Sequence, residues 1–258
     1  MAEYQLYEFR TVNRTLTREE VKEVDSWSSR GKVTSTSATF IYNYGSFKHK
    51  PEECLLSHFD IMLYYSNFGC RRMMFRFPEK LVNLKTLQQF GYNHSEDYQS
   101  SISVSAEGDY VLIDIEENLE EGFDTWIDCE ETLAAITPLW NDVLNGDYRF
   151  LYLMWHQFIE AAIEHEMLEK DEIEYPSVPN GLKKPNAALE EFNIFWEVDD
   201  FMVAKLAKKS LDIFAKVFDY KKAISFLSDN EKTEFLLRFA QNEAFVLQAF
   251  LKRLEGLS

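Results

Sequence analysis

The stretch SNFGCRRMMFRFPEK, residues 66–80, sets how the N-terminal part of this chain is built. Its apolar centre and the closing Pro78 predict a β-strand, although three arginines lie within it. Side chains alternate between the two faces of a strand, which gives one set of Arg71, Met73, Phe75 and Phe77 and a second set of Arg72, Met74 and Arg76. We expect the first set to face helices, with Arg71 at the mouth of the sheet, and the second set to lie on an open face.

Residues 4–12 alternate in the same way and predict the first strand of the sheet. If this strand neighbours the arginine-bearing one, Glu8 and Arg10 share the open face and pair across strands with Arg72 and Arg76. Such a ladder either keeps an open sheet face soluble or forms an anion-binding or partner-docking surface. Exposed ion pairs add only about 0–1 kcal/mol to stability, so both interpretations stay open.

The surrounding pattern predicts an α+β fold with a first domain over residues 1–118. Its other elements are a helix begun by a capping box of Thr17 and Glu20, a strand at 33–44, a helix from Pro51 that ends at Gly69, a short helix within 81–100 and a hairpin at 102–115. Helical crossovers favour parallel neighbouring strands. We therefore expect a small mixed β-sheet with helices on one face.

Residues 119–258 predict a second domain that is an all-helical bundle. Helices are expected near 129–145, 147–169, 187–196, 199–219 and 229–255. A second capping box, Ser228 with Glu231, begins the last of them.

The net charge of −17 is concentrated in the middle of the chain. Residues 101–200 hold 25 Asp and Glu against 4 Lys and Arg, whereas the flanking parts are close to neutral. A field of this sign repels nucleic acid phosphates and anionic lipid, and it favours basic protein surfaces. We expect a protein partner with a basic surface and no membrane. Solvation of the surface is the plain alternative, and the N-terminal sheet alone leaves nucleic acid binding open.

Composition and cysteine usage predict a soluble cytoplasmic protein. The chain of 258 residues is 46% hydrophobic, and it has neither an apolar run of about 18 residues nor the continuous apolar core of a signal peptide. Cys54, Cys70 and Cys129 are widely spaced. Their spacing argues against a disulfide framework and against a cysteine-rich zinc site.

The sequence contains no GxGxxG, GxxxxGK[ST], HExxH or GxSxG signature. Cys129 lies among carboxylates, which raise a thiol pKa and so disfavour a nucleophile. We predict that the protein is not an enzyme and has no catalytic residue and no cofactor. The alternative is an enzyme of unrecognised type, whose pocket would bring the three arginines to His58 or Asp60.

One helix carries His156, Glu160 and Glu164 at positions i, i+4 and i+8. Helical bundles present metal ligands at this spacing. The other faces of the helix are apolar, so we interpret the His/Glu face as its water side. A di-metal site also needs Glu-x-x-His on a second helix, which is missing, so we predict no metal site.

The candidate partner-binding residues form a sheet group and a group in and beside the acidic connector EENLEEGFDTWIDCEE. They are Glu8, Arg10, Arg71, Arg72 and Arg76 in the sheet, and Glu116, Glu117, Glu120, Glu121 and Asp124 in the connector. We predict a non-enzymatic interaction or adaptor module. Its acidic half binds a basic partner, and its sheet binds a second partner or holds the two halves together. The oligomeric state stays open.

Six motifs occur in order within residues 3–80: YQLYEF, LTREE, SSRGKVTSTS, YNYGSFKHKP, FDIMLY and GCRRMMFRFP. Over these residues the chain resembles a family of uncharacterised bacterial proteins that shares the pattern. The family has no established activity, so the resemblance implies no catalytic residue. It does imply that Arg71, Arg72 and Arg76 belong to a shared pattern.

In its acidic, motif-poor and helical character the chain is also similar to accessory proteins of type III-E CRISPR loci. No single motif carries this similarity. In those systems an RNA-guided effector activates a protease, and accessory proteins associate with the protease substrate and a sigma factor. The similarity implies an alternative role in antiviral defence, with one of these proteins as the partner.

Overall fold

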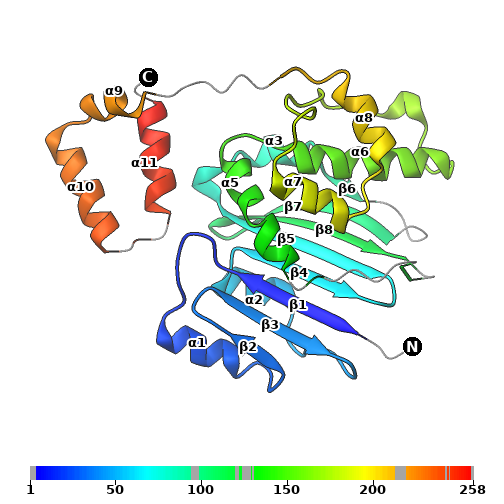
Figure 1. Cartoon of the computed structure of the whole chain (residues 1–258), viewed down its shortest axis with the longest axis horizontal. Coiled ribbons are helices and arrows are strands. Elements are labelled where there is room, and N and C mark those ends of the chain that lie inside the picture. Colours follow the sequence, from blue (N-terminus) through cyan, green and yellow to red (C-terminus); the bar gives the residue numbers. More distant parts are fainter. Residues whose placement is uncertain are drawn as a thin grey trace. The chain divides into compact units, whose positions relative to one another are not determined.

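The computed structural model describes residues 4–93, 99–119, 122–123, 129, 131–212, 219–241, 243 and 245–256. The chain divides into two compact units. The first comprises Met1–Val12 and Leu16–Asp212, and the second comprises Asn13–Thr15 and Ile213–Ser258. The first unit joins a β-sheet to helices (Figure 1), so the predicted α+β class is confirmed.

The sheet has eight strands in the order β2-β3-β1-β4-β5-β8-β7-β6. Their bounds are Gln5–Arg10 (β1), Gly31–Val33 (β2), Ser37–Tyr42 (β3), Ile61–Ser66 (β4), Cys70–Pro78 (β5), Tyr92–Asn93 (β6), Gln99–Glu107 (β7) and Tyr110–Asn118 (β8). Every neighbouring pair is antiparallel. The predicted mixed sheet is therefore wrong, because β4 follows α2 directly and runs antiparallel to both of its neighbours.

In the described part of the first unit, three helices lie between strands in the sequence, and five more follow the last strand. Their bounds are Arg18–Asp25 (α1), Pro51–His58 (α2), Leu84–Gln88 (α3), Thr132–Ile136 (α4), Pro138–Leu144 (α5), Arg149–Glu164 (α6), Ala187–Phe195 (α7) and Asp200–Ala207 (α8), with short 3₁₀ turns at Glu79–Leu81 and Lys170–Glu172. The capping box of Thr17 and Glu20 at the start of α1 is present as predicted.

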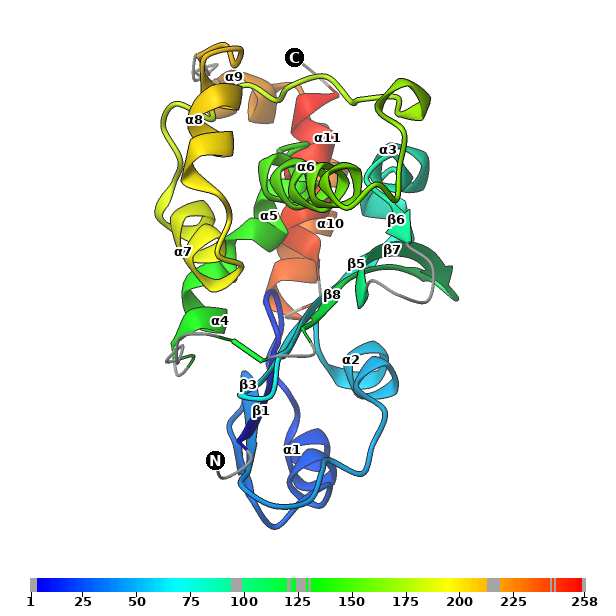
Figure 2. The same ribbon diagram turned by 90° about the vertical axis from the view of Figure 1, so that its right-hand side faces the viewer.

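Helices cover both faces of the sheet, as the edge-on view in Figure 2 shows. On one face, Phe75 and Phe77 of β5 pack on Phe150 of α6 and Trp140 of α5, each with 5.2 Å between ring centroids. On the other face, α1 and α2 cover an apolar cluster that includes Met74. The prediction of helices on one face is thus wrong. The boundary predicted between residues 118 and 119 falls inside the first unit, because α5 and α6 pack on β5.

Strand β4 was predicted as the end of a helix. Its sequence, IMLYYS, is apolar at nearly every position, and nearly every side chain is buried. A short run that is buried on both faces has no alternation to distinguish it from a buried helix. Gly69 does not end a helix but forms the turn from β4 to β5, with a φ of +99°. A Cβ atom there would meet the Leu119 carbonyl oxygen at 2.0 Å, so only glycine fits.

The described part of the second unit contains three short helices. They are Tyr220–Ser225 (α9), Asp229–Ala240 (α10) and Val246–Glu255 (α11), and the predicted capping box of Ser228 and Glu231 begins α10. Their shared core is small and consists of Ala223, Leu227 and Leu254, with Phe250 packed against it. In the part of the chain that is described, no helix has the length and apolarity that crossing a membrane requires.

Candidate functional site

Arg71 on β5 links the sheet to the C-terminal end of α7. Its side chain is 3% exposed, and its Nε donates to Glu117 of β8 at 2.6 Å. Its Nη1 donates to the Phe195 carbonyl at 2.8 Å and to Glu197 at 3.1 Å, while the guanidinium lies 5.3 Å from the ring centroid of Trp196. A cation is favourable at a helix C-terminus, where the last carbonyls lack helical partners. Arg71 is therefore an internal cross-link.

Two of these partners were missed by the sequence analysis. Glu197 lies 126 residues from Arg71 and Phe195 lies 124 residues from it. Glu197 adopts a left-handed backbone with a φ of +48°, which is uncommon for a residue other than glycine. Burial raises the pKa of Glu117, and the adjacent Arg71 only partly offsets this.

Arg72 lies on the opposite face of β5 and binds carboxylates from two elements. Its Nε and Nη2 donate to Asp114 of β8 at 2.8 and 2.6 Å, and Nη2 also donates to Glu52 of α2 at 2.5 Å. Burial alone would raise the pKa of Glu52, but its backbone hydrogen bond and Arg72 lower it. The Nε atom is 3.9 Å from Glu116. Arg72 thus ties α2 to the sheet.

Arg76 repeats this role one turn of α2 further on. Its Nη1 donates to the Leu56 carbonyl at 2.7 Å, its Nη2 donates to Asp60 at 2.7 Å, and the guanidinium lies 4.5 Å from the ring centroid of Tyr110. Asp60 is 0% exposed and also accepts the backbone N–H of Val12 at 2.8 Å. The arginine–aspartate contact of the enzyme hypothesis therefore exists, but the Asp60 carboxylate has no solvent contact.

Glu8 and Arg10 do not pair with the β5 arginines. Strand β1 lies between β3 and β4, so β4 separates it from β5. Glu8 is opposite Leu63, and Leu63 is opposite Met73, which places Glu8 on the face that carries Arg71. Arg10 instead donates to Glu8 at 2.9 Å, and burial raises the Glu8 pKa. The predicted cross-strand ladder is wrong because the neighbour order of the strands differs.

The prediction that the second set of arginines lies on an open face is also wrong. Arg71 and Arg76 are buried and Arg72 is partly buried beneath α2. Of the acidic connector, Glu116 and Glu117 belong to β8. The remaining three candidates, Glu120, Glu121 and Asp124, lie outside the described residues.

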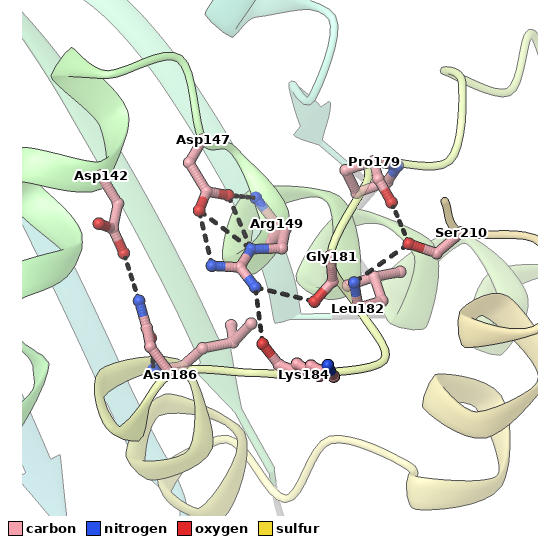
Figure 3. A network of polar contacts seen from close by, with 10 residues as sticks. Asp142, Asp147, Arg149, Pro179, Gly181, Leu182, Lys184, Asn186 and Ser210 are labelled. Carbon is pink, nitrogen blue, oxygen red and sulfur yellow. Dashed lines mark hydrogen bonds and ion pairs between the residues drawn. The ribbon is translucent and has the colours of Figure 1, made fainter. Parts of the chain in front are cut away.

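A third buried arginine, Arg149, holds the loop between α6 and α7 (Figure 3). Arg149 donates to both carboxylate oxygens of Asp147 and, through Nη1, to the Gly181 carbonyl at 2.9 Å. Ser210 donates to the Pro179 carbonyl at 2.7 Å and accepts the Leu182 N–H at 3.1 Å. These contacts satisfy the polar backbone groups of a loop that the sequence marks only by its prolines and glycine.

A hollow of ≈ 470 Å³ lies beside the C-terminal half of α6, between that helix and α8. Four carboxylates line it, Glu160, Glu164, Glu197 and Asp199, together with Lys205 as the single lysine. Apolar side chains complete its walls. In volume it matches ordinary small-molecule sites. In the described part of the chain, no cluster of three or more His, Cys, Asp or Glu side chains could hold a metal ion.

His156 also lines this hollow and is buried, so the interpretation of its helix face as the water side is wrong for His156, whereas the Glu160 side chain is 42% exposed and Glu164 is exposed. The residue is 8% exposed, and Tyr175 packs against its ring with 5.8 Å between centroids. Its Nε2 is 4.0 Å from Glu160, which accepts the Tyr175 hydroxyl at 3.1 Å. Burial lowers the His156 pKa, and burial and Glu160 raise the Tyr175 pKa to about 12.

Comparison with known proteins assigns none of these features. No family model, no curated protein and no solved structure matches this chain. The resemblance to the uncharacterised bacterial family therefore stays a prediction, and the function has to be argued from the site itself.

Proposed function

We propose that the protein is a non-enzymatic interaction module that binds a basic protein through the end of α6 and the segment that follows it. The observation that carries this proposal is the acidic segment, residues 164–174. It holds six carboxylates, all exposed, against Lys170. They are Glu164, Glu166, Glu169, Asp171, Glu172 and Glu174.

The fold does not account for these charges. The C-terminal end of a helix carries a partial negative charge, which favours basic side chains there. The last turn of α6 has no basic residue, and Glu164 lies in it. Glu166 follows with a left-handed backbone at a φ of +58°. An acidic run at this place opposes helix stability, which supports a role in binding.

Other acidic residues of the same third of the chain have clear structural partners. Asp147 pairs with Arg149, and Asp142 accepts the Asn186 amide at 3.0 Å (Figure 3). Glu117 and Asp114 pair with the β5 arginines. The acidic segment therefore differs from these four paired residues in that all six of its carboxylates are exposed.

Such a surface steers a basic partner through its field. Electrostatic complementarity raises association rates and sets specificity more than it sets affinity, and salt screens it within about 10 Å at 0.1 M. The same field disfavours nucleic acid and anionic membrane. The described residues add no observation that favours the CRISPR-accessory role or the enzyme role over this one.

The test is affinity capture from native lysate at low and high salt, with mass spectrometry of the retained proteins. A triple variant, Glu166→Lys/Glu169→Lys/Glu174→Lys, reverses the acidic segment. Its matched control, Glu79→Lys/Glu107→Lys/Asp109→Lys, makes the same change of charge at exposed positions elsewhere. We expect a basic protein that is lost with salt and with the first variant only. Capture that persists in the segment variant, or that salt does not weaken, would overturn the proposal.

A further inference from the structure

The hollow beside α6 holds carboxylates beyond those that the fold uses. Glu197 pairs with the sheet arginine, and Asp199 caps α8 by accepting the Phe201 N–H at 2.9 Å. The Glu164 side chain has neither a hydrogen bond nor an ion pair among the described residues. The hollow therefore presents an excess of negative charge that its own walls do not neutralise.

His156 is a second, independent feature of this site. It is more than nine-tenths buried, and its Nδ1 has no hydrogen-bond partner within the described part of the chain. A buried polar atom without a partner costs about 1–3 kcal/mol, so natural structures rarely leave one. A ligand in the hollow would change the surroundings of this ring directly. Burial lowers the His156 pKa, which favours the neutral imidazole beside a bound cation.

The walls of the hollow also offer apolar surface. Phe201 is 79% exposed at the first turn of α8, although large aromatic side chains are normally covered. Met202 and Ile163 continue this surface inside. A site lined by carboxylates and by an aromatic ring suits a long side chain that has an apolar stem and a planar cationic end.

We propose that this hollow receives an arginine side chain of the basic partner. The inference rests on the proposed function and names the contact through which the partner is recognised. Glu164 belongs both to the acidic segment and to the wall of the hollow, so the two surfaces are continuous. A guanidinium donates in a fixed planar fork that matches carboxylates and stacks on aromatic rings. An ammonium is a compact point charge with neither property.

Lys205 allows a test in which removal of a positive charge and removal of a negative charge have opposite effects on binding. It is the single cation among the described residues of the wall, so it repels an entering guanidinium. Removal of this charge strengthens binding, whereas removal of a carboxylate weakens it. A purely structural role of the hollow gives no reason for two such opposite effects.

The experiment is a titration of the full chain with Nα-acetyl-arginine amide, followed by the NMR signals of the His156 ring. Nα-acetyl-citrulline amide is the probe of the same shape without charge. We expect saturable shifts with the arginine probe only. Loss of one charge-assisted contact in Glu164→Gln weakens binding about tenfold. Lys205→Met tightens it, and Glu79→Gln, an exposed acidic residue outside both the hollow and the acidic segment, leaves it unchanged.

Other outcomes would overturn the inference without touching the proposed function. If the lysate partner is still lost on reversal of the acidic segment while His156 does not respond to the arginine probe, the hollow is not its contact. Equal binding of Nα-acetyl-lysine amide or of the citrulline probe would overturn the assignment to arginine. If no partner is captured but the arginine probe binds with this pattern of variants, the proposed function fails and the site stands.

Discussion

The arginines of β5 and the carboxylates at the end of α6 follow opposite rules. Arg71 and Arg76 are buried, and each joins a carboxylate to a backbone carbonyl of a helix. The carboxylates of residues 164–174 are exposed, with a single lysine among them. Both regions stand out in the sequence by their charge. The first uses its charge to hold elements together, and the second keeps its charge available.

This difference shows what unusual charge in a sequence means physically. A charge inside a fold has to be paired, because an unpaired buried ion costs several kcal/mol. Arginines inside an apolar stretch of sequence therefore indicate structural cross-links and not a binding surface. A surface charge has no such requirement, and a run that opposes the helix dipole indicates a demand other than stability. The predictions below test this division.

The largest effect is expected from Arg71→Met. Removal of the guanidinium leaves Glu117 buried without its partner and frees the Phe195 carbonyl. Breaking a buried ion pair from one side costs about 3–5 kcal/mol. Urea unfolding followed by circular dichroism measures this loss. Lys50→Met, at an exposed pair with Glu53, is the control and should leave the midpoint unchanged. Equal midpoints for both variants would refute the cross-link role of Arg71.

The pair of Arg76 and Asp60 tests coupling between α2 and the sheet. Each single variant, Arg76→Met or Asp60→Ala, leaves its buried partner uncompensated, so each should cost about 3 kcal/mol. The double variant should cost less than the sum, by an interaction energy of about 0.5–3 kcal/mol. The measurement is a double-mutant cycle in urea. Additive losses would show that the two side chains act independently.

The local sequence pattern predicted which helices and strands form better than it predicted which strands lie next to one another. The capping box of Thr17 and Glu20 and the strand β5 each depend on a few adjacent residues, and both are present. Strand order depends on contacts across the whole chain. Glu8 was therefore paired with the wrong strand and placed on the wrong face of the sheet, although the alternation along β1 was predicted correctly. Strand β4 was lost because burial on both faces removes alternation.

The residues of the candidate site were harder to predict for the same reason, because their contacts join distant parts of the chain. Nothing near Arg71 in the sequence indicates Glu197, because the chain brings them together only after α7 has packed on the sheet. The concentration of negative charge in the middle third was visible in the sequence, but the sequence analysis placed partner-binding candidates at Glu116 and Glu117. These residues turned out to lie in β8 beside arginines. Exposure cannot be read from charge alone.

A smaller and local effect is expected from Arg149→Lys. Lysine keeps the charge but not the planar fork, so the two contacts to Asp147 and the contact to the Gly181 carbonyl cannot all be made. The loss should be about 1–3 kcal/mol. Hydrogen exchange should become faster at the Gly181 and Leu182 amides while β5 keeps its protection. Uniform acceleration throughout the first unit would instead place Arg149 with the β5 arginines.

His156 should give the stability a weak pH dependence. Burial lowers its pKa below the ordinary 6.5, although Glu160 acts in the opposite direction. The unfolded chain therefore takes up this proton at a higher pH than the folded chain. The stabilisation is present above pH 6.5 and is lost as pH falls through the folded-state pKa. Titration of the ring by NMR gives the pKa directly, and His156→Phe should flatten the slope of unfolding free energy below pH 6.5. A ring pKa above 6.5 would contradict this.

The smallest expected change in stability tests most directly whether the exposed carboxylates at the end of α6 oppose the fold. Glu164 lies in the last turn of α6, so Glu164→Gln removes an unfavourable charge and should raise the unfolding free energy by about 0.3–1 kcal/mol. Glu190 lies in the first turn of α7, where the dipole favours it, and Glu190→Gln should lower the free energy by a similar amount. Both residues are exposed glutamates, so urea unfolding of the two variants compares helix ends and little else. If Glu164→Gln also destabilises the protein, the acidic segment contributes to the fold after all, and its charge no longer indicates binding. If the signs differ as expected, the chain gives up stability at the place where we propose that the partner binds.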